Sequence, residues 1–183
     1  VVPKASGGWR PVIDLSALNK YLKIPKFKME TIKSIAPSLQ DSQWAATVDL
    51  SDAYFHVPMH PLARPYLRFV SRQTVYQFRA LPFGLATAPF VFTWILRPFV
   101  RHLRAQGIQI HIYLDDWLIH HPDLQTLKSH IQIALELAKI LGFRVNYKKS
   151  QLTPVQKLKY LGVQLNFQTQ TIRPTLEKCQ DVK

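Results

Sequence analysis

The stretch that decides the fold is HIYLDDWLIHH, residues 111–121, because it sets two adjacent acids inside an apolar run. Apolar strands on either side of a short polar turn predict a β-hairpin. We expect strands over 108–114 and 117–120, with Asp115 and Asp116 at the tip. Asp tolerates turn backbone, so a purely structural turn is an open alternative at this point.

A second acid, Asp49, ends another apolar stretch, WAATVDL at 44–50. If the two strands are neighbours in one sheet, three carboxylates converge, and they repel unless cations neutralise them. Oxygen ligands suit Mg²⁺, which binds one or two carboxylates together with water and substrate phosphates. Two such ions about 3.5–4 Å apart can hold the attacking and leaving oxygens of a phosphoryl transfer.

The charge balance points to a nucleic-acid partner. The chain has 24 Lys and Arg against 11 Asp and Glu, a net charge of +13, and its cations are interleaved with apolar residues. Phosphate contacts of a folded basic domain gain from counterion release. A solvated basic surface explains the same charge without a ligand. A nucleotidyl transferase is expected to combine two features: basic residues that bind the nucleic acid and an acidic centre that binds metal ions.

Length and composition exclude several classes. A chain of 183 residues with 47% hydrophobic residues is long enough for one large domain or two small lobes. Its longest uncharged stretch, 80–96, is shorter than the roughly 20 residues that cross a bilayer, so we expect no membrane partner. Cys179 is the only cysteine, which excludes an internal disulfide and a cysteine-rich zinc site.

The rest of the pattern mixes helices with hairpins. We expect a strand over 9–15, a short helix ending at 22, a helix over 31–40, a hairpin of 67–70 with 75–78, helices over 87–106 and 123–141, and a last hairpin of 159–166 with 171–173. Because hairpins dominate, the pattern favours an α+β fold with an antiparallel sheet packed on helices.

Five of the seven histidines lie near the acidic segments: His56, His60, His111, His120 and His121. A zinc site is one interpretation, but no cysteine lies nearby. We expect surface or phosphate-facing histidines instead.

YLDD at 113–116 resembles the YxDD box of reverse transcriptases, and five other segments keep the order of that family. They are WRPVIDLSALNK (9–20), TVDLSDAYFHVPM (47–59), LPFGLATAP (81–89), LGFRVNYKKSQL (141–152) and KYLGVQL (159–165). Six ordered motifs over nearly the whole chain are far more specific than any one of them. VDLSDAYF and the FG of LPFG resemble retrotransposon enzymes more than retroviral ones, and a DIRS-like element is the type we expect.

The resemblance implies the fingers and palm of a right-hand polymerase over residues 1–183. A thumb is expected to start at about 174, with the rest of the thumb and an RNase H domain absent. The implied reaction is RNA-directed DNA synthesis: dNTPs are added to a primer 3′-hydroxyl on an RNA or DNA template. The implied cofactor is a pair of Mg²⁺ ions, with Mn²⁺ as a substitute.

The resemblance also assigns roles to single residues. Asp49, Asp115 and Asp116 match the catalytic, metal-binding aspartates, and the backbone carbonyl of Leu50 matches a further metal ligand. The primer end is assigned to Tyr113, Leu161 and Gly162.

The nucleotide is assigned first to Tyr54 with its neighbours Asp52 and Ala53. Tyr54 matches the steric gate, a ring that leaves no room for the 2′-hydroxyl of a ribonucleotide. Phe83 stands where retroviral enzymes place a glutamine, so it offers stacking in place of a hydrogen bond. Gly84 is expected to allow close backbone approach to nucleotide or template.

Three basic positions complete the assigned nucleotide site. Arg10 and Lys4 match the fingers residues that hold the triphosphate, with a plain surface lysine as the alternative for Lys4. Lys149, or its neighbour Lys148, matches the lysine beside the leaving pyrophosphate. The alternatives to a reverse transcriptase are a decayed or domesticated copy that only binds nucleic acid, a polymerase that uses ribonucleotides, and a basic scaffold. The oligomeric state is left open.

Overall fold

The computed structural model describes residues 2–3, 9–10 and 12–176. The chain divides into two compact units, the first made of Val1–Phe27 and Asp52–Ile95 and the second of Lys28–Ser51 and Leu96–Lys183. The chain leaves the second unit between Ser51 and Asp52, directly after the strand that carries Asp49. No helix among the described residues is both long and apolar enough to cross a bilayer.

The second unit is built on a four-stranded antiparallel sheet in the order β6–β7–β3–β8. Its strands are β6 (Gln109–Tyr113), β7 (Asp116–His121), β3 (Trp44–Asp49) and β8 (Gln151–Val155). The register of β3 against β7 runs from Trp44 opposite His121 to Asp49 opposite Asp116. The predicted hairpin and the predicted neighbouring strand are therefore confirmed, and the acids meet at one end of the sheet.

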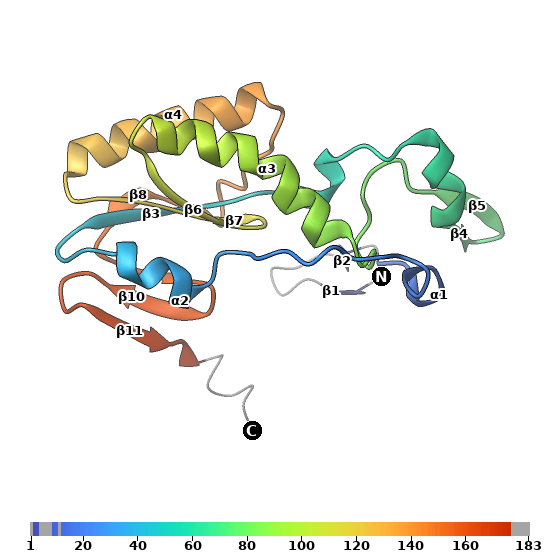
Figure 1. Cartoon of the computed structure of the whole chain (residues 1–183), viewed down its shortest axis with the longest axis horizontal. Helices are drawn as coiled ribbons and strands as arrows, with labels where there is room; N and C mark the ends of the chain where they lie inside the picture. The colour runs from blue at the N-terminus through green and yellow to red at the C-terminus, as the bar shows by residue number, and fades with distance from the viewer. Residues whose placement is uncertain (1, 4–8, 11, 177–183) are drawn as a thin grey trace. The chain divides into compact units, whose positions relative to one another are not determined.

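Both faces of this sheet are covered, which is why β7 reads as an almost continuous apolar run. Helix α4 (Leu124–Ile140) and the second-unit part of α3 (Ala88–Ala105) lie on one face (Figure 1). The ring of Phe99 in α3 lies 4.8 Å from that of Trp117 in β7. Both helices agree with the expected ranges. Asp123 caps α4 by accepting a hydrogen bond from the Thr126 amide at 2.7 Å.

The other face carries a second sheet, in the order β11–β10–β9. It consists of β9 (Lys157–Tyr160), β10 (Val163–Asn166) and β11 (Thr171–Pro174). A buried apolar cluster that includes Ile35, Leu118 and Leu165 joins it to β7 and to α2 (Ile32–Ile35). The core of the second unit therefore covers both faces of β7, the strand that begins at Asp116.

Two expectations for this unit are wrong in detail, and one strand of the structure is new. The strand expected over 159–166 is broken by a turn at Leu161 and Gly162, whose φ values of 47° and 73° reverse the chain. The helix expected over 31–40 splits into α2 and the 3₁₀ helix η1 (Ala36–Ser38), because Pro37 cannot continue α-helical bonding. Strand β8 was not expected.

Side chains form hydrogen bonds with the outward-facing backbone groups of the edge strand β6. The Glu30 carboxylate accepts the Ile112 amide at 3.0 Å, and the Arg104 guanidinium donates to the Ile110 carbonyl. Glu30 and Arg104 also form an ion pair. An exposed edge that could pair with another chain is thus covered.

The first unit has less regular structure. Strands β1 (Val2–Pro3) and β2 (Trp9–Arg10) form a short pair, so the strand expected over 9–15 is limited to its first residues. Helix α1 (Ser16–Asn19) ends before the expected position 22. The 3₁₀ helices η2 (Ala53–His56) and η3 (Pro61–Leu67) precede the expected hairpin, which is confirmed as β4 (Arg68–Ser71) and β5 (Thr74–Gln77).

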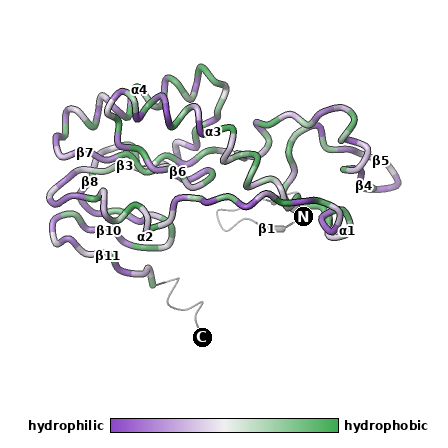
Figure 2. The backbone as a smooth tube through the Cα atoms, viewed as in Figure 1, coloured by the Kyte–Doolittle hydropathy of each residue, from purple (hydrophilic) through white to green (hydrophobic). Residues whose placement is uncertain are grey.

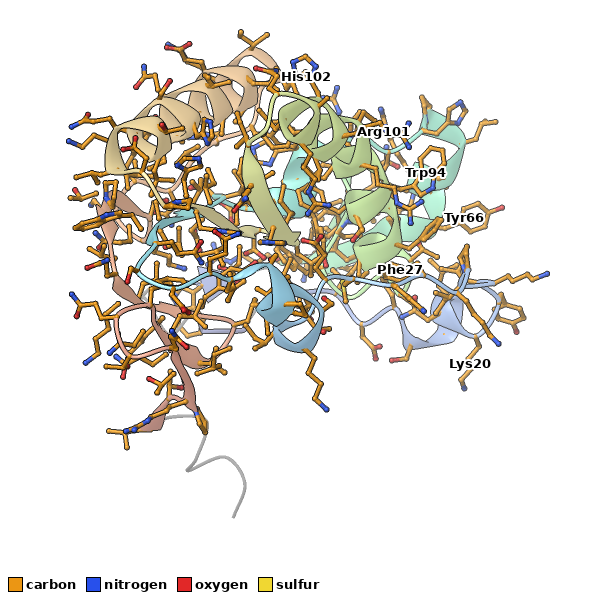
Figure 3. All side chains as sticks on the ribbon, turned by 60° about the vertical axis from the view of Figure 1, so that its left-hand side comes forward. Lys20, Phe27, Tyr66, Trp94, Arg101 and His102 are labelled. Carbon is orange, nitrogen blue, oxygen red and sulfur yellow. The ribbon has the colours of Figure 1, made fainter. Side chains whose placement is uncertain are left out.

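The surface of the first unit exposes large aromatic side chains. Tyr66 is 71% exposed and Trp94, in the first-unit part of α3, is 59% exposed (Figure 3). Phe27 packs edge-on against Phe90 with ring centres 5.5 Å apart.

Candidate active site

The two central carboxylates face each other across adjacent strands. Asp49 is the last residue of β3 and Asp116 the first of β7, and their Cα atoms are register partners. Asp115 belongs to the turn between β6 and β7, where Leu114 has a φ of 54°. The amide of Leu50 donates to the Asp115 carbonyl at 3.0 Å, which fastens this turn to the end of β3. The structure therefore brings the three predicted acids to one end of one sheet.

The two facing acids, Asp49 and Asp116, lie close enough to neighbouring carboxylates for their charges to interact. Burial, and then the charges of Asp115 and Asp49, raise the pKa of Asp116 to about 6, while Lys149 opposes the shift. Burial also raises the pKa of Asp49, with Lys149 again opposing and Asp115 adding to the rise. This excess of negative charge is what a divalent cation would neutralise.

A cavity of about 210 Å³ opens beside these acids. Its walls include Asp49, Asp116 and Lys149, together with Leu161 and Gly162 from the turn between β9 and β10. Five of the predicted site residues, distant in sequence, are therefore gathered around one hollow.

The remaining predicted residues of this unit lie close by. Tyr113 is the register partner of Asp116 across the β6–β7 hairpin. Asp115 lies in the turn, outside the set of described residues that line the cavity, but near enough to shift the pKa of both facing acids. Of the two candidate lysines, Lys149 is the one on the cavity wall.

The donor set fits Mg²⁺. Within the described part of the chain, no three His, Cys, Asp or Glu side chains are grouped closely enough to enclose an ion by themselves. Two facing carboxylates that leave other positions open match an ion that also takes water and substrate phosphates. These carboxylates do not fit a closed structural zinc site, which is the kind of site that was considered for the histidines.

Two residues that sequence reasoning missed anchor the lysine. The backbone amide of Asn146 donates to the backbone carbonyl of Asp49 at 2.8 Å. The backbone amide of Asp49 donates to the Ser150 hydroxyl at 3.0 Å. The Ser150 hydroxyl in turn donates to the Asn146 carbonyl at 2.8 Å. Lys149 lies between these anchors, so the NYKKS segment sets its position beside the acids.

Tyr160, the last residue of β9, contacts the backbone of the β6–β7 hairpin that carries the acids. Its buried hydroxyl lies 3.3 Å from the carbonyl of Asp116 and 3.5 Å from that of His111. Burial raises the pKa of Tyr160, so the phenol stays protonated as a donor. This residue was not predicted; its signal in the sequence is an aromatic residue directly before Leu161.

The expectation of surface histidines is wrong for His120, which is fully buried. Its Nε2 lies 3.1 Å from Nε2 of His111, and its Nδ1 lies 2.9 Å from Oε1 of Gln43. Burial, with the nearby His111 and His121, lowers the pKa of His120 to about 3. The buried His120 is therefore neutral, and it joins His111 and Gln43 in a network of side chains within the sheet.

Two predicted nucleotide residues of the first unit, Tyr54 and Phe83, belong to an aromatic cluster. Tyr54 lies in η2, with its ring 5.0 Å from Phe83 and 5.7 Å from Phe92. The preceding Asp52 has a φ of 51°, and Ala53 is buried. The structure thus unites Tyr54 and Phe83 through direct packing.

Gly84 has a structural reason within the chain, which leaves the expected approach to nucleotide or template as a prediction. Its φ is +97°, and a Cβ there would lie 2.7 Å from the backbone oxygen of Ile13. The Asn19 side chain donates to the Gly84 carbonyl and accepts from the Ala86 amide, both at 2.9 Å. This glycine is required where the LPFG loop approaches the backbone of another segment.

The two predicted triphosphate residues are described least. Arg10 pairs with Val2 through the backbone of β2. The side chain of Arg10 and the whole of Lys4 lie outside the described residues.

A palm-type antiparallel sheet that presents facing carboxylates beside a lysine and a hairpin turn defines the class of right-hand polymerases. A family model described as reverse transcriptase (RNA-dependent DNA polymerase) matches residues 2–165. The chain belongs to the reverse transcriptase family.

Viral polymerases are among its curated relatives. Protein P of Duck hepatitis B virus (strain Germany/DHBV-3) is 28% identical over 163 residues, which are 86% of this chain and 20% of that protein. The putative enzymatic polyprotein of Cassava vein mosaic virus is 26% identical over 182 residues, 97% of this chain and 27% of that protein. The chain thus spans about a fifth to a quarter of the length of these relatives. The DIRS-like origin stays a prediction.

Solved structures establish the fold. A foamy viral protease–reverse transcriptase in complex with double-stranded DNA is 24% identical with a TM-score of 0.84, covering 99% of this chain and 31% of that one. The foamy viral enzyme in complex with an RNA/DNA hybrid is 23% identical with a TM-score of 0.78, covering 100% and 24%. The expected α+β fold of a polymerase is confirmed.

Proposed function

We propose that this chain is the catalytic part of an RNA-directed DNA polymerase that adds dNTPs to a primer 3′-hydroxyl. The observation that carries the proposal is the pair Asp49 and Asp116, which are register partners and line one cavity together with Lys149. Membership of the reverse transcriptase family and a net charge of +13 support a nucleic-acid substrate.

Asp49, Asp115, Asp116 and the carbonyl of Leu50 would hold two Mg²⁺ ions, or Mn²⁺ in their place. When bound, such ions stabilise the charge on the attacking and leaving oxygens of a phosphoryl transfer. Lys149 would place its ammonium group beside the leaving pyrophosphate, since Asn146 and Ser150 fix its backbone next to Asp49. Its charge would thus act where negative charge leaves the reacting centre.

The nucleic acid would be a template, RNA or DNA, with an annealed primer. Tyr113, Leu161 and Gly162 would support the primer end, because Leu161 and Gly162 line the acidic cavity and Tyr113 adjoins Asp116. Relatives of the fold have been solved with double-stranded DNA and with an RNA/DNA hybrid, which supports both kinds of duplex as ligands.

Choice of the sugar would rest on Tyr54, with Asp52, Ala53, Phe83 and Gly84 around the nucleotide. The ring of Tyr54 packs against Phe83, and this packing would hold it in place to exclude a 2′-hydroxyl. Lys4 and Arg10 would hold the triphosphate through charge-assisted hydrogen bonds.

Primer extension at saturating RNA template–primer tests the proposal, with Mg²⁺ and either dNTPs or rNTPs. We expect dNTP-dependent extension that falls at least a hundredfold in Asp115→Asn, while template–primer binding persists. Tyr54→Ala should retain extension and accept rNTPs more readily. Binding without any extension by the unsubstituted chain would favour the alternative, a domesticated domain that only binds nucleic acid. A preference of the unsubstituted chain for rNTPs would contradict the proposed substrate.

A further inference from the structure

The outer face of the second sheet carries cations in an ordered array. Along β9 and β10, Leu158, Tyr160 and Leu165 turn into the core, so the alternate residues turn outward. Opposite residues in an antiparallel pair share a face. We call this face the outer array; it consists of Lys157, Lys159, Gln164, Asn166, Thr171 and Arg173.

The array has two rows across the three strands. In one row Gln164 lies between Lys159 and Arg173; in the next, Asn166 lies between Lys157 and Thr171. The rows are two residues apart along the strands, which is about 7 Å. A neutral amide thus separates the flanking positions in each row.

A hollow of about 240 Å³ lies over this array. Its described walls are Lys157, Gln164, Asn166, Thr169, Thr171 and Arg173, all polar, with two cations and no carboxylate among them. Such a wall favours an anion with many hydrogen-bond acceptors. Amide and hydroxyl donors beside cations are the groups with which proteins contact the phosphates and sugars of nucleic acid.

The array is continuous with the candidate active site. Lys159, Tyr160, Leu161 and Gly162, which extend from β9 into its turn, line the acidic cavity. A nucleic-acid strand held at the cavity would therefore meet the outer array along the same hairpin. The array repeats its polar groups along the strands, which suits a repeating backbone better than one small anion.

We propose that the outer array is a second contact site for the phosphodiester backbone of the nucleic acid that the polymerase copies. This deepens the proposed function and rests on it for the identity of the duplex. The contact is independent of base sequence, since the array offers cations and neutral donors to phosphate and sugar. It adds affinity and salt dependence without taking part in the reaction.

The test compares two double variants that lose the same charge. Lys157→Gln with Arg173→Gln removes the two cations of the hollow; Lys128→Gln with Lys139→Gln removes two exposed cations of α4. Binding of a fluorescent RNA–DNA duplex is measured by anisotropy over a series of salt concentrations. Each lost phosphate contact lowers the magnitude of the log–log salt slope by about 0.9.

For the outer-array variant we expect a slope smaller in magnitude by roughly 1–2 and binding weakened about tenfold at low salt. The α4 variant should keep its slope within half of that change. Equal changes in both variants would show a general charge effect and overturn the proposal, as would the absence of duplex binding by the unsubstituted chain.

Two further measurements separate this proposal from the proposed function. At saturating duplex, the outer-array variant should extend primers at the unsubstituted rate; a slower rate would contradict a role confined to binding. Asp115→Asn should keep the full salt slope. A chain that binds through the array but extends no primer would leave the second contact standing and remove the polymerase activity.

Discussion

Two hairpins of the chain share a design and differ in what surrounds them. In the second unit, β6–β7 closes with Tyr113 opposite Asp116; in the first, β4–β5 closes with Ser71 opposite Thr74. Each has a two-residue turn that contains a non-glycine residue with positive φ. Yet four successive residues of β7 are buried, whereas every residue of β5 is exposed, and the tip of β4–β5 is strongly hydrophilic (Figure 2).

This difference in packing between the two hairpins shows which of them can hold like charges close together. A two-stranded hairpin with open faces is marginally stable in water and tolerates little added strain. The β6–β7 hairpin is held by helices on one face and by the β9–β11 sheet on the other, so it can keep three carboxylates together despite their repulsion. Packing, rather than hairpin geometry, distinguishes the acid-bearing turn.

The largest expected effect comes from removing one aromatic ring from each hairpin. Trp117 is completely buried in β7 beside Phe99, so Trp117→Ala should cost about 3–5 kcal/mol of unfolding free energy. Tyr76 in β5 is 50% exposed, and its ring stacks on that of Phe69, its register partner in β4. Tyr76→Ala should therefore cost roughly 1 kcal/mol of unfolding free energy or less. Urea unfolding followed by circular dichroism measures both. Similar costs for the two variants would show that the hairpins are packed alike.

The second prediction concerns the electrostatic cost at the acidic turn. The pKa of Asp116 is about 6 in the folded chain, above the ordinary value of 3.8, so its ionised form destabilises the fold at pH values above 6. Asp116→Asn should therefore stabilise the chain by about 1–2 kcal/mol at pH 7.5, after allowance for partial exposure. This gain should shrink as pH falls through 6 and disappear below about 4.

Thermal unfolding measures this gain as a rise in Tm of about 3–6 °C at pH 7.5. Asp41→Asn, at an exposed acid outside the sheet strands, is the matched control and should leave Tm nearly unchanged. Adding Mg²⁺ should raise the Tm of the unsubstituted chain more than that of Asp116→Asn, because an ion bound to the folded state stabilises it. A lower Tm for Asp116→Asn at pH 7.5 without Mg²⁺ would contradict the repulsion.

The elements that sequence predicts well are those whose signal is local. The acid-tipped hairpin and the strand of Asp49 are apolar runs that end at polar residues. Helix α4 has a capping Asp123 and a terminal Gly142 with φ of +83°, and both are visible in the sequence. Convergence of the acids followed from placing these strands in one antiparallel sheet.

The elements that sequence misses depend on distant partners. β8 contains Pro154 and pairs irregularly with β3 at the sheet edge, where a missing donor is tolerated. His120 is polar by type but buried because His111 and Gln43 satisfy its nitrogens. Ser150 has no signal of its own, since its role lies in a bond to Asp49. In each case a tertiary contact decides what the local pattern leaves open.

The smallest expected effect compares the two turns themselves. Gln73 has a φ of 65° in the exposed turn, where a side chain is strained and glycine is not. Gln73→Gly should therefore stabilise the chain by about 0.5–1 kcal/mol, because the relieved strain outweighs the added freedom of the unfolded chain. Leu114→Gly relieves a similar strain but loses a half-buried side chain, so its stability should change little.

The two glycine variants should differ most in primer extension. Leu114 immediately precedes Asp115, and its carbonyl accepts the Trp117 indole N–H at 3.3 Å. A glycine there loosens the backbone that holds the acids, so extension should fall severalfold although the fold persists; catalytic groups must be held within about 0.5 Å. Gln73→Gly lies outside the acidic turn and should leave the reaction at saturating substrate unchanged. If Leu114→Gly extended primers at the full rate, the strained turn would serve only to connect two strands, and rigidity of the acids would have to come from β3 and β7 alone.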